Sequence, residues 1–270
     1  MTTNDLSTRI GAALDRIRAT RPLIHQITNF VVMNDTANVT LHVGALPVMA
    51  HSLLEVEEMV GLAGALVLNP GTLDIDWVEA MVVAGLAARR QGIPIVLDPV
   101  GAGATQYRTQ SNLRLLGTVK PTIVRGNAGE IAALIGAGGQ VRGVESVGDV
   151  GDVAAIAQRA AREWGATVAI TGKRDFISDG ERTLAVDNGS AWLTTLTGTG
   201  CSSTTLVGCF AAVEPDALVA AAGALACLGH AAELAEPDAK GPGTFKVALY
   251  DALYNLTGEA LSAGARVEPL

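Results

Sequence analysis

A glycine-rich turn directly before an apolar helical segment is the feature of this sequence best suited to chemistry. The turn is Thr197-Gly198-Thr199-Gly200-Cys201-Ser202-Ser203-Thr204, and the apolar run covers residues 205–213. Glycines at such a junction let backbone N–H groups converge on an anion, and the helix dipole adds about 0.3–1 kcal/mol of preference for negative charge. A turn with an ordinary N-cap explains the same residues, because a Gly-x-Gly pair is common. The segment is a candidate anion hole built on Gly198, Thr199 and Gly200.

Cys201 favours a functional role for this turn. A thiol in the first turn of a helix lies where its thiolate is stabilised by the helix dipole. Cys209 and Cys227 fall inside Ala- and Leu-rich segments and resemble ordinary small core residues. We therefore predict a role in chemistry for Cys201 alone among the three cysteines.

A carboxylate follows a second apolar run. Residues 95–97 are Ile-Val-Leu, and Asp98 leads into the turn Gly101-Ala102-Gly103. Ligands of open parallel sheets gather outside the carboxyl ends of the strands, so Asp98 lies where metal or phosphate is usually bound. The alternative interpretation is that Asp98 only caps the following turn.

Arg125, Asn127 and Glu130 form a third candidate group at the end of another apolar run. Arg125 can hold a phosphate, while Asn127 and Glu130 have the spacing of a capping box, which is a purely structural device. Both interpretations can hold together. With Asp98, Glu130 would supply two oxygen ligands, directly or through water, of the kind that a nucleotide-bound Mg²⁺ uses.

A fourth run ends in Thr171-Gly172-Lys173, which resembles the end of a phosphate-binding P-loop. Arg174 stands where that motif requires Ser or Thr, and Thr167 stands where it requires its first glycine. The segment is therefore not a P-loop. Neither Gly-x-Gly turn of the chain has the third glycine of a dinucleotide fingerprint, so an NAD-dependent dehydrogenase ranks last among the functions considered.

The N-terminal part contributes a polar segment that could face a ligand. His25, Gln26, Thr28 and Asn29 follow an apolar run, and this density of hydrogen-bonding groups favours a ligand wall over a core strand. Asn-rich turns also satisfy their own backbone, and Met49, on a later apolar segment, has the character of a core-filling residue.

The elements that must position these residues alternate along the chain. Short apolar runs at 65–68, 93–97, 122–124 and 167–170 are separated by segments of helical period at 75–90, 107–118, 128–135 and 150–164. Strands that are apolar throughout indicate a parallel sheet with helices on both faces. We predict an α/β fold of this three-layer kind.

After Lys173 the pattern changes. Residues 176–178 and 183–186 flank Asp179-Gly180-Glu181-Arg182, which predicts an antiparallel hairpin, and from Cys201 onward about three helices follow, with no further strand expected. We interpret residues 136–151 as a surface loop and the whole chain, 1–270, as a single domain, because neither a long linker nor a solenoid repeat is present.

Composition excludes several classes of partner. The 270 residues are 49% hydrophobic and 17% charged, with a net charge of −8, so a globular enzyme is favoured and nucleic acid is not expected as a partner. No membrane segment is expected, since we find no run of about 18 uncharged apolar residues. Three cysteines without a CxxC pair and four histidines without a close ligand spacing suggest neither disulfides nor zinc, and a cytoplasmic location fits.

Read together and in order, six segments resemble the signature of the hydroxyethylthiazole kinase family, within the wider group of ribokinase-like kinases. They are HQITNFVVMNDTANVTLHVGALPVMA, LNPGTL, VLDPVGAGAT, VRGNAGEI, ITGK and LTGTGCSST, and the resemblance runs from about Pro22 to Gly258. It implies a ribokinase-like fold and the transfer of phosphate from ATP to 4-methyl-5-(2-hydroxyethyl)thiazole, in the salvage of thiamine.

The resemblance also implies roles for individual residues. Met49 and Gly198 would contact the thiazole, Arg125 and Thr171 would contact ATP, and Asp98 and Glu130 would serve Mg²⁺. Most ribokinase-like enzymes have Asp after the second glycine of the anion hole, whereas the thiazole kinases resemble this chain in having a cysteine, here Cys201. That residue would accept a proton weakly or only orient the alcohol.

The family forms trimers with active sites between subunits, and the resemblance implies a homotrimer here. Two other interpretations stay open on the sequence alone. One is a ribokinase-like kinase for another small alcohol, such as hydroxymethylpyrimidine, and the other is a nucleotide-binding sensor without turnover.

Overall fold

The computed structural model describes residues 2–136 and 150–270, and its centre is one mixed sheet in the order β2-β1-β3-β4-β5-β6-β7-β8-β9. Neighbours from β2 through β6 pair in parallel, and β7, β8 and β9 are added antiparallel. The strands are β1 (Leu23–Ile27), β2 (Leu46–Val48), β3 (Ala65–Leu68), β4 (Ile95–Leu97), β5 (Ile123–Asn127), β6 (Thr167–Thr171), β7 (Asp175–Ser178), β8 (Thr183–Val186) and β9 (Val267–Pro269).

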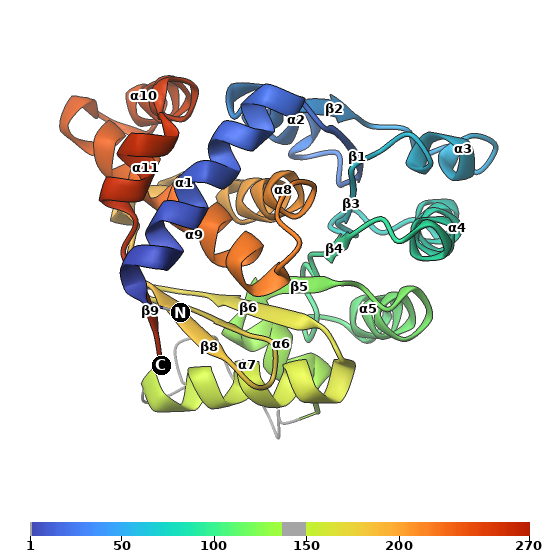
Figure 1. The fold of residues 1–270 in the computed structure, drawn as a ribbon. Helices are drawn as coiled ribbons and strands as arrows, with labels where there is room; N and C mark the ends of the chain where they lie inside the picture. The colour runs from blue at the N-terminus through green and yellow to red at the C-terminus, as the bar shows by residue number, and fades with distance from the viewer. Residues whose placement is uncertain (1, 137–149) are drawn as a thin grey trace.

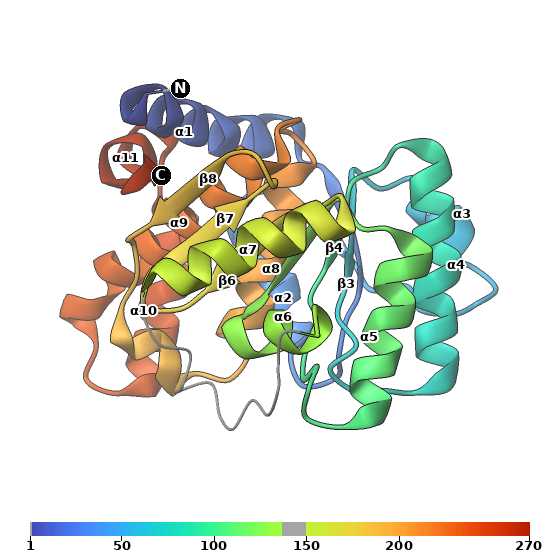
Figure 2. The ribbon, with the colours of Figure 1, turned by 90° about the horizontal axis from the view of Figure 1, so that it is seen from below.

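Helices cover both faces of this sheet. The helices are α1 (Thr3–Thr20), α2 (Met33–His42), α3 (Val56–Val60), α4 (Ile75–Gln91), α5 (Gln106–Val119), α6 (Ala128–Leu134), α7 (Val150–Trp164), α8 (Thr199–Ala211), α9 (Ala217–Ala235), α10 (Pro242–Asn255) and α11 (Gly258–Gly264), with 3-10 turns η2 (Ala191–Thr195) and η3 (Glu236–Asp238). One layer contains α3 to α7, and the other contains α8 and α9 against the sheet with α1, α2, α10 and α11 around them (Figures 1 and 2).

Strands β3 and β4 are apolar throughout because each contributes to two cores. Val67 of β3 and Val96 of β4 point into the core under α8 and α9, whereas Leu66, Leu68 and Leu97 point into the core under α4 and α5. Successive side chains of a strand alternate between faces, so these two strands are apolar on both of their faces. The three-layer α/β fold expected from the sequence is confirmed.

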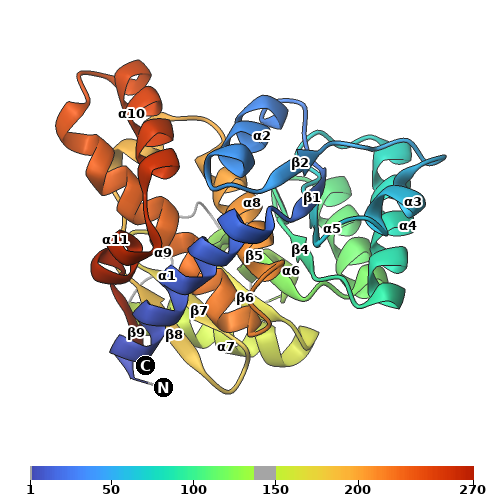
Figure 3. The same cartoon turned by 45° about the horizontal axis from the view of Figure 1, so that its top comes forward.

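The predicted hairpin is also confirmed, since β7 and β8 pair antiparallel across the turn that contains Gly180. The expectation that no strand follows it is wrong, because β9 pairs with β8. Only Val267 of β9 is buried, so these three residues carry no periodic pattern. The strand brings the C-terminus beside α1, as Figure 3 shows. The predicted loop at 136–151 falls almost wholly on residues 137–149, outside the described ranges.

The ligand wall expected at His25 to Asn29 is wrong for its first two residues. His25 and Gln26 lie on β1 and are completely buried. His25 Nε2 donates to the Ala50 carbonyl oxygen at 2.7 Å, and Gln26 Nε2 donates to Thr40 Oγ1 at 2.8 Å. A polar core strand is tolerated here because α2 and the segment after β2 supply the hydrogen-bond partners that burial demands.

One described helix, α9, has the length and composition of a membrane span over residues Ala217–Asp238. In the fold, 78% of its most apolar window is buried. It packs on α8, α1, α10 and the strands β6 to β8. The apolar composition of α9 is therefore explained by its position as a core helix.

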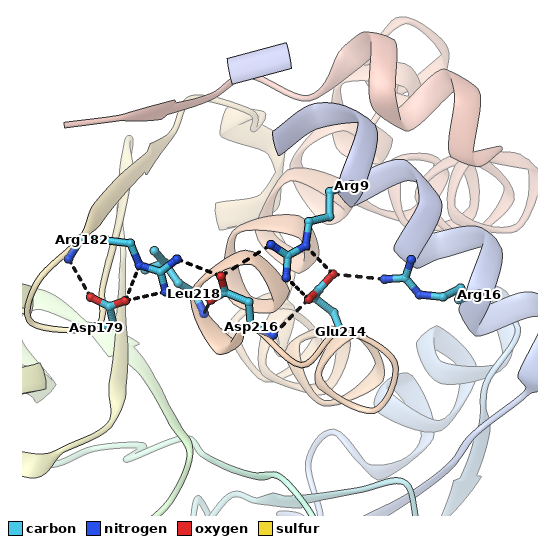
Figure 4. Close-up of polar contacts among 7 residues, drawn as sticks. All are labelled: Arg9, Arg16, Asp179, Arg182, Glu214, Asp216 and Leu218. Carbon is cyan, nitrogen blue, oxygen red and sulfur yellow. Dashed lines mark hydrogen bonds and ion pairs between the residues drawn. The ribbon is translucent and has the colours of Figure 1, made fainter. Parts of the chain in front are cut away.

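An ion-pair cluster ties α1 to the segment between α8 and α9 and to the β7–β8 turn (Figure 4). Glu214 is 3% exposed and accepts hydrogen bonds from Arg9 Nε at 2.9 Å and Arg16 Nη2 at 3.1 Å. Arg182 continues the cluster, with bonds to Asp216 at 2.9 Å and Asp179 at 2.7 Å. Burial opposes ionisation of Glu214, but the bonds from Arg9 lower its pKa below the ordinary value of 4.5.

We expect Arg9→Ala to lower the free energy of unfolding by about 2–3 kcal/mol at pH 7, because it leaves the buried Glu214 charge with Arg16 alone. The pKa of Glu214 is lower in the folded chain than in the unfolded chain, so ionised Glu214 stabilises the fold. This contribution is fully present above pH 4.5 and is lost as the pH falls further. Urea unfolding at pH 7 and pH 4 measures the loss and its decrease in acid. Arg90→Ala, in the exposed pair with Glu57, is the control, and an equal loss in both variants would contradict the prediction.

Candidate active site

The register of the sheet brings several polar residues to one edge. Leu68 of β3 pairs with Leu97 of β4, so the residues that follow them, Asn69 and Asp98, lie side by side. Leu97 pairs in turn with Val124 of β5, which sets Arg125 beside Asp98. Because β3, β4 and β5 are parallel, these carboxyl ends meet at the same edge, as the sequence predicted.

A chain of hydrogen bonds connects these strand ends to the start of α8. Asn29 Nδ2 donates to Asn69 Oδ1 at 2.9 Å, and Asn69 Nδ2 donates to Asp98 Oδ2 at 3.1 Å. The sulfur of Cys201 lies 3.2 Å from Asn69 Nδ2 and 3.7 Å from Asn29 Nδ2. Thr204, one turn further along α8, donates its hydroxyl to Asp98 Oδ2 at 2.7 Å. The structure thus brings together Asn29, Asp98 and Cys201, which the sequence proposed separately.

Arg125 is the cation of this group. Its Nη1 lies 3.8 Å from Asp98 Oδ2, and its Nη2 donates a hydrogen bond to Thr171 Oγ1 at the end of β6. The side chain is only 11% exposed, and its buried Nε has no hydrogen-bond partner among the described residues. A guanidinium with an unused donor in a buried position is suited to an anionic ligand.

Glu130 has the structural role that its spacing predicted. Its Oε2 accepts from Asn127 N at 2.9 Å, and Asn127 Oδ1 accepts from Glu130 N at 2.9 Å, which forms the capping box of α6. Its Oε1 accepts from Gly101 N at 2.9 Å and so connects β5 to the turn after β4. The Glu130 charge also contributes to the raised pKa of Asp98.

Burial dominates the ionisation of two groups in this site. The pKa of Asp98 is raised to about 6 by complete burial, against the opposing effect of Arg125. Burial and the neighbouring Asp98 charge raise the pKa of the Cys201 thiol to about 11, although bonds from Asn69 and Asn29 oppose the shift. The expected stabilised thiolate is therefore wrong, because desolvation and a nearby carboxylate outweigh the dipole of α8.

The turn before α8 has the geometry of an anion hole. Gly198 has φ of 87° and caps α8, a conformation that glycine adopts without strain. Among the residues described, none accepts a hydrogen bond from the backbone N–H groups of Thr199, Gly200 or Cys201, whereas Ser202 N bonds to Gly198 O at 2.8 Å. Gly200 lies against Arg125, since a Cβ at this glycine would come within 3.0 Å of Nη1. Three N–H groups without a partner among the described residues therefore lie at a helix start that is in contact with a guanidinium.

A cavity of about 710 Å³ opens beside this turn. Its walls include Arg125, Thr171, Thr199 and Gly200, together with the residues after β6 and β8. The space is large enough for a drug-sized ligand and lies on the Arg125 side of α8. Within the described ranges, no cluster of three or more His, Cys, Asp or Glu side chains has the arrangement of a complete metal site.

Met49 makes no hydrogen bond to this group among the described residues. It follows β2, the outermost strand, and is half-buried, and its carbonyl oxygen accepts from His51 Nδ1 at 3.3 Å. Asn69 and Thr204 were not proposed from the sequence, although both contact Asp98. Asn69 could have been found, because it follows an apolar strand just as Asp98 does, whereas Thr204 looked like one hydroxyl in a run of four.

A mixed sheet with helices on both faces, polar strand ends and a helix start preceded by a glycine-rich turn are the features of a ribokinase-like α/β fold. The pyridoxal kinase from Staphylococcus aureus in complex with ADP superposes with a TM-score of 0.67, over 92% of this chain and 99% of that chain, at 15% identity. At this identity the likeness shows the fold alone.

Closer relatives define the family. The model of the hydroxyethylthiazole kinase family matches residues 14–259. The hydroxyethylthiazole kinase of Chloroflexus aggregans is 62% identical over 270 residues, which are 100% of this chain and 96% of the relative. The structure of the hydroxyethylthiazole kinase protein from Pyrococcus horikoshii superposes with a TM-score of 0.90 at 47% identity, over 97% of this chain and 99% of that chain. The chain belongs to the hydroxyethylthiazole kinase family.

Proposed function

We propose that this protein transfers the γ-phosphate of ATP to the hydroxyl of 4-methyl-5-(2-hydroxyethyl)thiazole in thiamine salvage. Family membership supports the substrate. The observation that carries the chemistry is the convergence of Asp98, Arg125 and Cys201 on the start of α8, where three N–H groups lack partners among the described residues. We propose that the alcohol approaches Cys201 near Gly198, Asn29 and Met49, and that ATP enters the 710 Å³ cavity beside Arg125 and Thr171.

Each residue then has a defined task. The N–H groups of Thr199 to Cys201 stabilise charge on the phosphoryl group during transfer, and the Arg125 guanidinium, held by Thr171, binds phosphate oxygens. Asn29 and Asn69 fix the position of the Cys201 sulfur. With a pKa of about 11 the thiol is protonated at neutral pH, so we infer that Cys201 orients the alcohol and does not act as its base.

The carboxylates fit a nucleotide-bound Mg²⁺. Such an ion uses one or two carboxylates, with phosphate oxygens and water completing the coordination, so two carboxylates suffice. Asp98 and Glu130 would hold the ion, directly or through water. The Glu130 charge contributes to the raised pKa of Asp98. The ion would offset charge between the β- and γ-phosphates.

The proposal is tested by measuring Mg²⁺-dependent ADP formation by the purified protein with hydroxyethylthiazole and, separately, with hydroxymethylpyrimidine. Turnover with the thiazole supports the proposal. A preference for the pyrimidine would keep the kinase and overturn its substrate, and binding of ATP without turnover on either alcohol would favour a nucleotide sensor.

We expect Cys201→Asp to keep or raise kcat. Transfer through a loose transition state depends mainly on alignment and charge, and an Asp at this position would add the stronger base found in most ribokinase-like enzymes. Steady-state kinetics with hydroxyethylthiazole measure the effect, and Cys209→Ala, in the buried part of α8, controls for loss of a thiol. Loss of activity with unchanged ATP binding would contradict the prediction.

Three wider expectations belong to the same proposal. We expect a single domain, which the one continuous sheet from β2 to β9 supports. We expect a homotrimer with active sites between subunits, which sedimentation of the purified protein would test. The three free cysteines are compatible with the reducing cytoplasm as the location.

A further inference from the structure

Asp175 is a buried carboxylate in the wall of the 710 Å³ cavity, and the mechanism proposed above gives it no task. It is the first residue of β7 and is 9% exposed. Arg125, Thr171, Gly172 and Lys173 line the same cavity. A charged group is seldom retained at such burial without compensating contacts, so the contacts of Asp175 should indicate what it does.

The carboxylate holds the short connection between β6 and β7. Its Oδ1 accepts a hydrogen bond from Gly172 N at 2.9 Å, which closes residues 172–174 into a tight turn. Thr171 immediately precedes this turn, and Lys173 lies within it. Among the described residues, Oδ2 accepts no hydrogen bond, so one oxygen of Asp175 is sufficient for the backbone and the other is unused.

The charge of Asp175 also acts on Arg125. Burial raises the pKa of Asp175 to about 6, and the bond from Gly172 and the Arg125 charge both oppose that shift. Arg125 lies 3.8 Å from Asp98, and it lines the same cavity as Asp175. The charge of Asp187, beyond β8, adds a small further increase to the pKa of Asp175.

A carboxylate that itself touched a triphosphate would repel it, so direct phosphate contact does not explain Asp175. The turn that Asp175 holds directly follows Thr171, and Arg125 lines the same cavity; Thr171 and Arg125 are the residues to which the proposed function assigns ATP. By fixing the position of the turn and of the Arg125 guanidinium, Asp175 would favour ATP binding without contacting phosphate itself.

We propose that Asp175 is a positioning residue for the nucleotide, which fixes the turn at residues 172–174 through its hydrogen bond and the direction of Arg125 through its charge. The inference rests on the proposed function, since that places ATP in this cavity. It predicts that the two contributions can be separated, because Asn keeps the acceptor oxygen and loses the charge, whereas Ala loses both.

The test measures KM for ATP, KM for the thiazole and kcat in Asp175→Asn and Asp175→Ala, with equilibrium binding of Mg²⁺-ADP in the absence of any alcohol. We expect KM for ATP and the ADP dissociation constant to rise about threefold to fivefold in Asp175→Asn and roughly tenfold to 50-fold in Asp175→Ala, with KM for the thiazole unchanged. Asp179→Asn, at the exposed end of the same hairpin, is the matched control and should alter none of these values.

The outcomes separate this inference from the proposed function. If the wild-type protein does not phosphorylate the thiazole, the proposed substrate is overturned. If both Asp175 variants of that protein still bind ADP more weakly than the wild type, the inference stands. Unchanged ADP binding in both variants, or a parallel rise of both KM values, would overturn the inference while wild-type turnover stands. If the substitutions raise KM strongly for ATP and leave KM for 2′-deoxy-ATP unchanged, Asp175 contacts the ribose. That result would also overturn the inference. Thermal unfolding of each variant confirms that the protein assayed is folded.

Discussion

Asp98→Asn should lower kcat roughly a thousandfold while leaving the protein folded and more stable at neutral pH. The loss of activity follows from removing a carboxylate that is proposed to hold Mg²⁺ and that faces Arg125 at 3.8 Å. Asn keeps the size of the side chain, and its oxygen can still accept from Thr204, which now donates to Asp98 at 2.7 Å. The site would therefore lose its charge with little change of shape.

The gain in stability follows from the same burial. The pKa of Asp98 rises from the ordinary 3.8 to about 6. Above pH 6 the carboxylate is therefore ionised in both states, and its charge has a higher free energy in the folded chain than in the unfolded chain. This costs up to about 3 kcal/mol, at 1.36 kcal/mol for each pKa unit, and the cost disappears below about pH 4 where both states are protonated. Asn carries no such cost.

Urea unfolding of the wild type and Asp98→Asn, without nucleotide or Mg²⁺, measures this difference at pH 7.5 and pH 4. We expect the variant to be more stable at the higher pH and equal at the lower. Asp76→Asn, exposed in the first turn of α4, is the control and should change neither kcat nor stability by more than about 0.5 kcal/mol. A variant that retains most of its activity would remove Asp98 from the proposed metal site.

Gly198→Ala should lower kcat about a hundredfold and destabilise the fold by roughly 1–2 kcal/mol. Gly198 has φ of 87°, which strains any residue with a Cβ, and a Cβ there would come within 2.7 Å of Val32 Cγ1. Relief of this contact must shift the start of α8, where Thr199, Gly200 and Cys201 present their N–H groups. Because those groups act through direction and distance, a small shift weakens transition-state binding more than it weakens the fold.

Steady-state kinetics and thermal unfolding of the same preparation separate the two effects. Gly117→Ala, at an exposed position of α5 with no heavy atom within 4 Å of the added Cβ, is the matched control. It should leave kcat unchanged and slightly stabilise the helix, since alanine favours helix over glycine. If Gly198→Ala lost stability alone and kept its kcat, the turn would be structural and not an anion hole.

The sequence predicted the parallel half of the sheet well and its edges poorly. Strands β3 and β4 are apolar throughout, and β5 and β6 contain apolar runs, because helices cover both faces of the sheet; this pattern is visible in the residues themselves. Strand β1 carries His25 and Gln26, whose partners Ala50 and Thr40 belong to later segments, so its polar residues suggested a ligand wall. The residues of β9 were too few for any pattern to be visible.

For the candidate site, the residue types and their places after strands were sufficient to propose Asp98, Arg125 and Glu130. Their mutual arrangement was not, because it depends on the register between strands far apart in the chain. Asn69 bridges Asp98 and Cys201 over separations of 29 and 132 residues, which no local pattern reveals. Asp175 is another case, since its position at the start of a predicted hairpin gave no sign that it faces a cavity.

The ionisation of Cys201 shows most clearly which properties the sequence determines and which the tertiary structure decides. The sequence by itself determined that a cysteine follows a glycine-rich turn at the start of a helix, and the helix dipole alone would favour its thiolate. Only the tertiary structure decided that the sulfur is desolvated beside Asp98, which raises its pKa to about 11. The order of residues determines which side chains and N–H groups lie at the start of a helix. Burial and neighbouring charges arise when distant segments pack together, and they decide the protonation state of those side chains.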